Sequence, residues 1–262
     1  MSVAAAVAEL RDARRTGVPC PPLRDRLVPS GDVATAYEVQ AEQVRQWVAE
    51  GRRVVGAKIG LTSQAVQRQL GVTEPDFGVL TADAAVPDGG EVPAGALLQP
   101  RVEAEVAFVL GADLPHPDVT AVDVLRATDH LLACIEIADS RIAGWDISIV
   151  DTVADNASSG LFVLGTRPRP VAAVDLRLCG MVIEHAGEPV SVGAGAACLG
   201  NPVTAVTWLA RTLALAGRPL RAGDLVLSGA LGPMVPATPG ATYEARISGL
   251  GSVRVSFARE QP

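Results

Sequence analysis

Two glutamates on one short segment could form part of a metal site. Within residues 101–110, Glu103 and Glu105 alternate with apolar residues, so a strand here would present both carboxylates on the same face. A third carboxylate, Glu136, lies between two isoleucines, where an unpaired charge would be costly. Three carboxylates without sulfur or imidazole ligands suit a hard cation such as Mg2+ or Mn2+. The alternative for Glu103 and Glu105 is the solvated face of an edge strand.

Lys58 and a polar segment are further candidates for chemistry. Lys58 is surrounded by small and apolar residues in the stretch 55–63, where it could pair with a substrate carboxylate or transfer a proton. Residues 151–160 form a polar stretch rich in small side chains. The simpler alternatives are a lysine whose charge reaches solvent and an ordinary loop that caps a helix.

The composition excludes several other classes of site. Histidines are few and dispersed, and the cysteines show no CxxC spacing, so we expect no zinc site, disulfide framework or Ser-His-Asp triad. The formal net charge of −7 and the lack of long basic runs argue against a nucleic-acid partner. Neither a signal peptide nor a membrane-spanning run is recognisable, so we expect a cytoplasmic protein with no membrane partner.

Helices and strands must position these residues. Apolar residues at helical spacing predict helices over 2–15 and 32–50, the second capped by Asp32, and two more over 119–134 and 202–216. Period-2 patterns and short apolar runs after residue 51 predict a strand-rich body. The expected strands cover 54–55, 102–110, 176–184, 225–227, 243–247 and 253–257, with hairpin turns at 185–187 and 248–251.

The order of these elements indicates the fold class. Strands and helices are segregated along the chain rather than alternating regularly, which is typical of an α+β protein. We expect a small N-terminal domain over residues 1–75 and a catalytic domain over residues 76–262.

Six segments together resemble a known enzyme family. These segments are 56–63, 75–78, 103–105, 136–142, 151–160 and 222–230, and the resemblance extends over nearly the whole chain. They are similar to the 2-oxopent-4-enoate (2-hydroxypenta-2,4-dienoate) hydratases and the related oxalocrotonate decarboxylases of the fumarylacetoacetate hydrolase superfamily.

The resemblance implies a fold and a site. The fold would be a small N-terminal helical domain packed on a mixed β-roll, and we expect a homo-oligomer. Mg2+ or Mn2+ would be held by the glutamates of the trio, Glu103, Glu105 and Glu136. Three candidate catalytic residues would lie in or beside the pocket, namely Lys58, Asp76 and Ser158.

The resemblance favours a hydro-lyase that adds water to 2-hydroxypenta-2,4-dienoate, or a close analogue, to give a 4-hydroxy-2-oxo acid. Residues 139–145 and 151–159 look more like the hydratase branch than the decarboxylase branch. Decarboxylation of a 2-oxo-3-enedioate is an alternative, because it uses the same metal-stabilised dienolate. Hydrolysis of a C–C bond in an acylpyruvate usually needs a histidine with a glutamate, and only His130 lies near these motifs. A non-catalytic relative is the remaining alternative.

Overall fold

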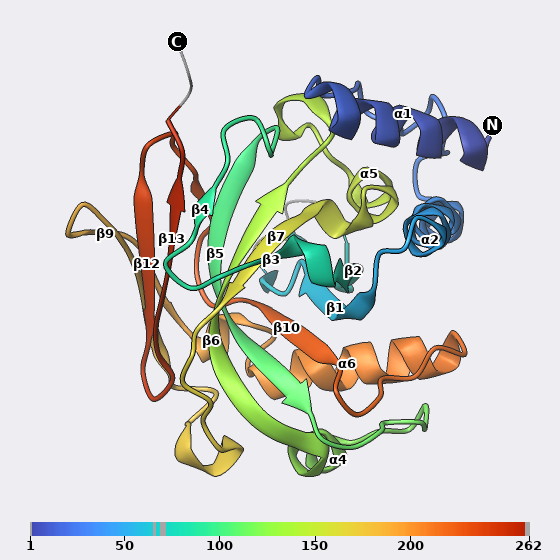
Figure 1. The fold of residues 1–262 in the computed structure, drawn as a ribbon. Coiled ribbons are helices and arrows are strands. Elements are labelled where there is room, and N and C mark those ends of the chain that lie inside the picture. Colours follow the sequence, from blue (N-terminus) through green and yellow to red (C-terminus); the bar gives the residue numbers. More distant parts are fainter. Residues whose placement is uncertain (1, 65–66, 69–71, 260–262) are drawn as a thin grey trace.

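The computed structural model describes residues 2–64, 67–68 and 72–259 (Figure 1). The described α-helices are α1 (Val3–Thr16), α2 (Val33–Ala49), α4 (Ala121–Ala127), α5 (Ile149–Ala154) and α6 (Pro202–Leu215). The strands are β1 (Val54–Gly60), β2 (Asp76–Thr81), β3 (Ala85–Val86), β4 (Glu91–Val92), β5 (Pro100–Leu110), β6 (Thr128–Asp139), β7 (Ser159–Leu164), β8 (Gly180–His185), β9 (Glu188–Ala194), β10 (Leu225–Ala230), β11 (Val235–Pro236), β12 (Thr242–Ile247) and β13 (Gly251–Phe257). None of the described helices is both long and apolar enough to cross a membrane.

Three helices form where the sequence predicts them, and side-chain caps fix their first turns. The Asp32 carboxylate accepts a hydrogen bond from the Thr35 amide at 3.0 Å at the start of α2. Asn201 accepts one from the Val203 amide at 3.1 Å, and Pro202 occupies the first turn of α6. The predicted hairpin turns also form, between β8 and β9 and between β12 and β13.

The predicted helix over 119–134 is wrong in its second half. The helix α4 ends at Ala127, and β6 begins at the next residue. Every residue from 131 to 138 is buried, so both faces of β6 are covered and its sequence lacks the alternation of a half-exposed strand. The predicted strand over 176–184 begins only at Gly180, because residues 175–179 form a turn closed by the Cys179 amide and the Asp175 carbonyl at 2.7 Å.

Two sheets make up the body of the protein. The larger follows the order β2-β1-β10-β5-β6-β7-β3, with β11 added to β5, and the smaller follows β4-β13-β12-β8-β9. Strands β5 and β6 are long and strongly curved, and the smaller sheet lies beside them (Figure 1). The main core fills the space between the sheets and α6, with Phe108, Ile135 and Val255 at zero exposure.

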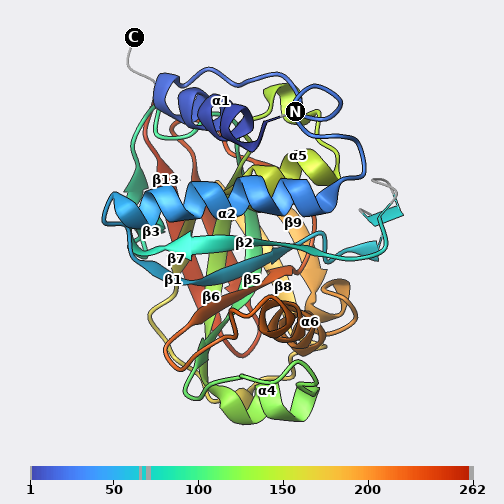
Figure 2. The ribbon, with the colours of Figure 1, turned by 90° about the vertical axis from the view of Figure 1, so that its right-hand side faces the viewer.

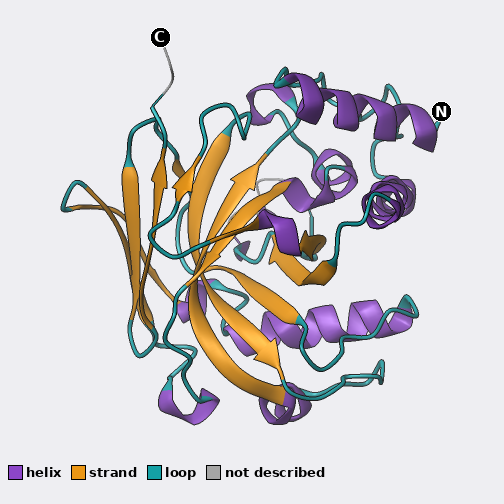
Figure 3. Ribbon diagram, in the orientation of Figure 1, coloured by secondary structure: helices purple, strands orange, loops and turns teal. Residues whose placement is uncertain are grey.

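The N-terminal helices pack on the side of the larger sheet that faces away from the smaller sheet (Figure 1). Most helices gather on that side of the molecule (Figure 3), and α2 runs alongside β2 and β1 (Figure 2). A separate core joins α1 and α2 to α5 through Leu10, Val39 and Val153, all at 1% exposure or less. Helix α2 also donates hydrogen bonds from Gln40 to the Phe77 carbonyl at 2.8 Å and from Gln43 to the Ala154 carbonyl at 2.6 Å. These contacts connect the helices directly to the strand and helix that border the site.

Candidate metal centre and active site

Three glutamates meet at the centre of the larger sheet. Antiparallel pairing of β5 with β6 places Glu103 directly opposite Glu136, and Glu105 follows two residues along the same face. One oxygen from each of the three carboxylates lies within 4.8 Å of the others. Strand β5 lies between β10 and β6, and Glu105 has no exposed surface, so the alternative of a solvated edge strand does not describe this face.

Burial and mutual repulsion perturb these carboxylates. Burial, followed by the charge of Glu136, raises the pKa of Glu103 to about 7, although Lys58 and Arg101 oppose the rise. Burial, with the charges of Glu136 and Glu103, raises the pKa of Glu105 well above its ordinary value. One oxygen of Glu105 and one of Glu136 are buried without accepting a hydrogen bond or an ion pair within the described part of the chain. Such oxygens, all hard donors, fit a divalent cation that would neutralise them.

Lys58 is a buried cation next to the glutamates. Its ammonium lies 3.1 Å from a carboxylate oxygen of Glu136, and only 4% of the residue is exposed. Burial alone would lower the pKa of Lys58, but the charges of Glu136 and then Asp76 outweigh it and raise the pKa. Lys58 therefore carries a proton and is already engaged by acidic neighbours.

Asp76 and Ser158 lie beside Lys58 and are linked by Thr152. The Thr152 hydroxyl donates to the Asp76 carboxylate at 3.2 Å and is 3.4 Å from the Ser158 hydroxyl. Burial raises the pKa of Asp76, although the Lys58 charge counteracts it. Its second carboxylate oxygen is buried and accepts no hydrogen bond in the described structure. The site therefore contains a carboxyl group that binds its proton more tightly than an exposed aspartate does.

Most polar side chains of the segment 151–160 support the structure around the site. Asp151 accepts hydrogen bonds from the Leu23 amide at 2.7 Å and the Arg24 guanidinium at 2.8 Å. Asn156 pairs with the backbone of Val79 through bonds of 2.8 and 3.0 Å. For Asp151 and Asn156, the simpler alternative of an ordinary structural loop therefore applies.

Buried Asp155 fixes the other end of this segment. It forms a buried ion pair with Arg141, and the Arg141 amide donates to it at 2.9 Å. This pair connects the end of β6 to the turn that carries Ser158.

A cavity of about 760 Å3 reaches four of the six predicted site residues, and Glu105 and Glu136 lie behind its lining. Lys58, Asp76, Glu103, Thr152 and Ser158 all line it. Other lining residues have backbone in the left-handed region, with φ of 57° at Leu61, 57° at Trp145 and 51° at Ala157, and Ser158 itself has φ of 51°. This conformation is costly for residues with a side chain, so the surrounding contacts must hold it.

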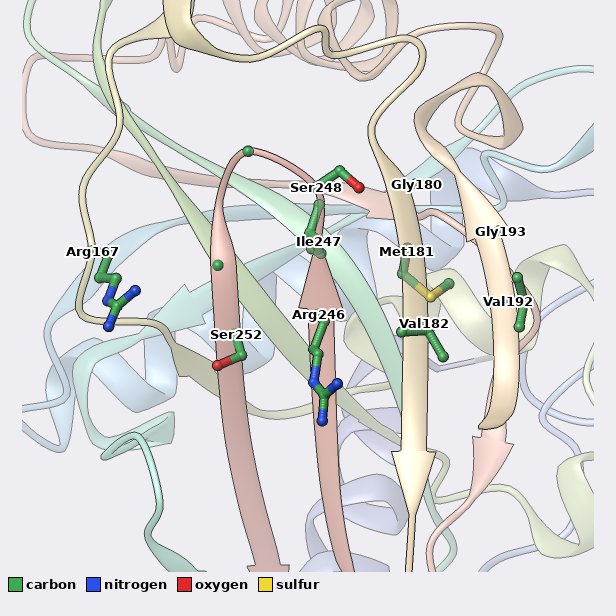
Figure 4. A pocket seen from close by; sticks show the side chains of 12 residues that line it. Arg167, Gly180, Met181, Val182, Val192, Gly193, Arg246, Ile247, Ser248 and Ser252 are labelled. Carbon is green, nitrogen blue, oxygen red and sulfur yellow. The ribbon is translucent and has the colours of Figure 1, made fainter. Parts of the chain in front are cut away.

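Two other features lie away from this cavity. His130 follows Asp129 on β6, pairs with its carboxylate at 2.7 Å, and lies six residues before Glu136, roughly 20 Å along a strand. A second depression, on the smaller sheet, is lined by residues that include Arg167, Arg246 and Ser252 and by no carboxylate (Figure 4). Neither feature supplies a histidine–glutamate pair for hydrolysis.

Residues that the sequence analysis did not single out also line the cavity. They include Thr152, Trp145 and Arg101. The signal for Arg101 was available, because it precedes Glu103 by two residues and so shares its strand face. Trp145 gave no such signal, because a turn rather than a regular element places it.

Known proteins resemble the chain over nearly its full length. It matches the family model described as fumarylacetoacetate (FAA) hydrolase C-terminal over residues 34–258. The chain belongs to this family. It is 55% identical over 258 residues to 2-keto-4-pentenoate hydratase 2 of Dechloromonas aromatica (strain RCB), with 98% of each chain covered. It is 44% identical over 250 residues to 2-hydroxyhexa-2,4-dienoate hydratase of Comamonas testosteroni, covering 95% of this chain and 94% of the relative.

A solved structure in the same family supports the fold assignment. The 4-oxalocrotonate decarboxylase from Pseudomonas putida G7, complexed with magnesium and adipate, is 37% identical and has a TM-score of 0.92, with 98% of each chain covered. The predicted α+β fold, with N-terminal helices on a mixed β-roll, is therefore confirmed.

Proposed function

We propose that this protein is a divalent-metal-dependent hydro-lyase that adds water to 2-hydroxypenta-2,4-dienoate, or to a close analogue, and releases a 4-hydroxy-2-oxo acid. The observation that carries the proposal is the glutamate trio beside Lys58, at a cavity that Glu103, Lys58 and Asp76 line. The names of the hydratase relatives, at 44% and 55% identity, support this substrate class.

We assign the metal to Glu103, Glu105 and Glu136 and the ion to Mg2+ or Mn2+. All three donors are hard carboxylate oxygens, and the related decarboxylase was solved with magnesium. When bound, the cation would supply Lewis-acid stabilisation of negative charge on the 2-oxygen of the substrate.

Acid–base groups of the chain must move the protons. Converting the dienol acid to the product places hydrogen on C5 and C3 and hydroxide from water on C4, and the enol hydroxyl loses its proton. Asp76 is suited to exchange these protons because burial raises its pKa, and protonated Lys58 can donate or relay them. Ser158, linked to Asp76 through Thr152, would donate a hydrogen bond to the substrate.

Decarboxylation of a 2-oxo-3-enedioate is the second candidate. The structure of the related decarboxylase favours it, since the two chains share a fold over 98% of their lengths. The hydratase relatives share more sequence with this chain, 55% against 37% identity. Release of carbon dioxide from the enedioate would discriminate between the two reactions.

The direct test is incubation of the purified protein and Mg2+ with freshly generated 2-hydroxypenta-2,4-dienoate. We expect a product heavier by one water, no product in excess chelator, and little product with Glu136→Gln. Glu188→Gln is the matched control, because Glu188 is an exposed glutamate on the smaller sheet. Loss of carbon dioxide from an enedioate, without hydration of the dienoate, would replace the proposal with the second candidate.

A further inference from the structure

Arg101 is a half-buried cation that faces the cavity beside the glutamates. It lies two residues before Glu103 on β5, roughly 7 Å away along the strand, and both side chains line the cavity. Its guanidinium stacks 4.3 Å from the centre of the Trp145 ring and touches the Met234 sulfur at 3.4 Å. Among the residues that the structure describes, no carboxylate lies within ion-pair distance of Arg101.

Hydrogen bonds hold Trp145, the residue on which Arg101 stacks, in a fixed position. The Trp145 indole donates a hydrogen bond to the Gln99 carbonyl at 3.0 Å, and the Gln99 side chain accepts one from the Gly144 amide at 2.8 Å. The same side chain donates to the Ser140 carbonyl at 2.8 Å. Arg101 is therefore presented by a fixed aromatic surface before any ligand arrives, which limits the entropy lost on binding.

The charges that line the cavity leave one cation free. The cations among the described lining residues are Lys58 and Arg101, and Lys58 is engaged by Glu136 at 3.1 Å. Asp146, another lining residue, pairs at 2.6 Å with Arg24 from the N-terminal part.

We propose that Arg101 binds the carboxylate of the substrate, and that the cavity accepts one carboxylate rather than two. The inference rests on the substrate class proposed above and narrows it to 2-oxo acids with an uncharged tail. A carboxylate beside Arg101 leaves the tail free to face Lys58 and Asp76, which belong to β1 and β2 on the other side of β10. A second carboxylate in the tail would meet acidic Asp76 and no unengaged cationic side chain among the described lining residues.

The test uses stable ligands that cannot react, so its outcome is independent of turnover. Calorimetry on the Mg2+-loaded protein would give dissociation constants for 2-oxopentanoate and for its uncharged amide. Arg101→Met should weaken binding of the acid by about tenfold to a hundredfold and leave binding of the amide almost unchanged. Arg101→Lys should recover part of the loss, because it keeps the charge but not the two-pronged donor.

The matched control is Arg52→Met. Arg52 is also half-buried and stacks over a tryptophan, Trp47, at 4.9 Å, but it does not line the cavity. We expect its acid and amide dissociation constants to equal those of the wild type. The Mg2+ dissociation constant of Arg101→Met, measured without organic acid, should not rise, because the substitution removes a positive charge near Glu103.

The number of carboxylates is tested on the wild type with 2-oxohexanoate and 2-oxohexanedioate. We expect the monoacid to bind at least about tenfold more tightly. Equal or tighter binding of the diacid would overturn the single-carboxylate inference. Equal weakening of acid and amide in Arg101→Met, loss of Mg2+ together with ligand, or no binding of 2-oxopentanoate by the wild type would overturn the role of Arg101. Failure to hydrate the dienoate with these binding results intact would refute only the proposed reaction.

Discussion

Removing the divalent metal should make the stability of the fold fall as the pH rises. The metal-free protein holds the Glu103 carboxyl with a pKa of about 7, against an ordinary value of 4.5, chiefly because of burial and then because of Glu136. The folded state therefore binds this proton more tightly than the unfolded chain does. Stability contributed by the proton is present at low pH and is lost as the pH rises from about 4.5 to about 7.

The size of the effect follows from the pKa difference. A rise from 4.5 to about 7 corresponds to about 3 kcal/mol of unfolding free energy. For a chain of this length such a loss lowers the melting temperature by roughly 6 °C or more. Mg2+ at about a hundred times its dissociation constant would restore about 2.7 kcal/mol at high pH.

The assay is thermal unfolding in chelator between pH 5 and pH 8, for the wild type and for Glu103→Gln. Other groups also titrate in this range, so the informative quantity is the difference between the two proteins. Glu103→Gln should be the more stable of the two at pH 8 and should show a flatter dependence on pH. Parallel curves would mean that Glu103 titrates as an ordinary surface carboxyl, and the reasoning from burial would be refuted.

The remaining predictions concern turnover and metal content. Lys58→Met should fold and bind Mg2+ but lose about a hundredfold or more in kcat, because it keeps the apolar stem and removes the charge; unchanged kcat would make Lys58 purely structural. Glu103→Gln and Glu136→Gln should each remove most activity, and the double variant should lose little more, because both act through one cation; additive losses, with bound metal quantified, would contradict a shared site. Gly60→Ala should lower kcat at least about tenfold without loss of Mg2+, because its new methyl group would displace the Asp76 carboxylate; wild-type kcat would show that the position of Asp76 is unimportant.

The local sequence pattern predicted which way side chains point better than it predicted which residues they contact. Alternation within 101–110 is enough to place Glu103 and Glu105 on one face, and the structure has them so. The pairing of Glu103 with Glu136 depends on the register of β5 against β6, which involves residues 33 positions apart and leaves no local trace.

Burial hid other elements from the sequence pattern. Strand β6 is buried on both faces, so its first half was mistaken for a helix, and β2 and β7 were missed. Lys58 and Asp76 were placed at the site by family resemblance, since nothing in their own segments shows that β1 and β2 pair at this point.

The left-handed backbone around the cavity bears on how the protein could be engineered. Leu61, Trp145, Ala157 and Ser158 each adopt a conformation that disfavours a side chain by roughly 1 kcal/mol, and they all border the cavity. Four of the eight described non-glycine residues with left-handed backbone therefore border the reactive groups. A selection for heat resistance alone would favour glycine at positions such as 61 and 157, and each such change would loosen the walls that orient the substrate. Directed evolution of this protein therefore has to select for turnover and thermal tolerance together.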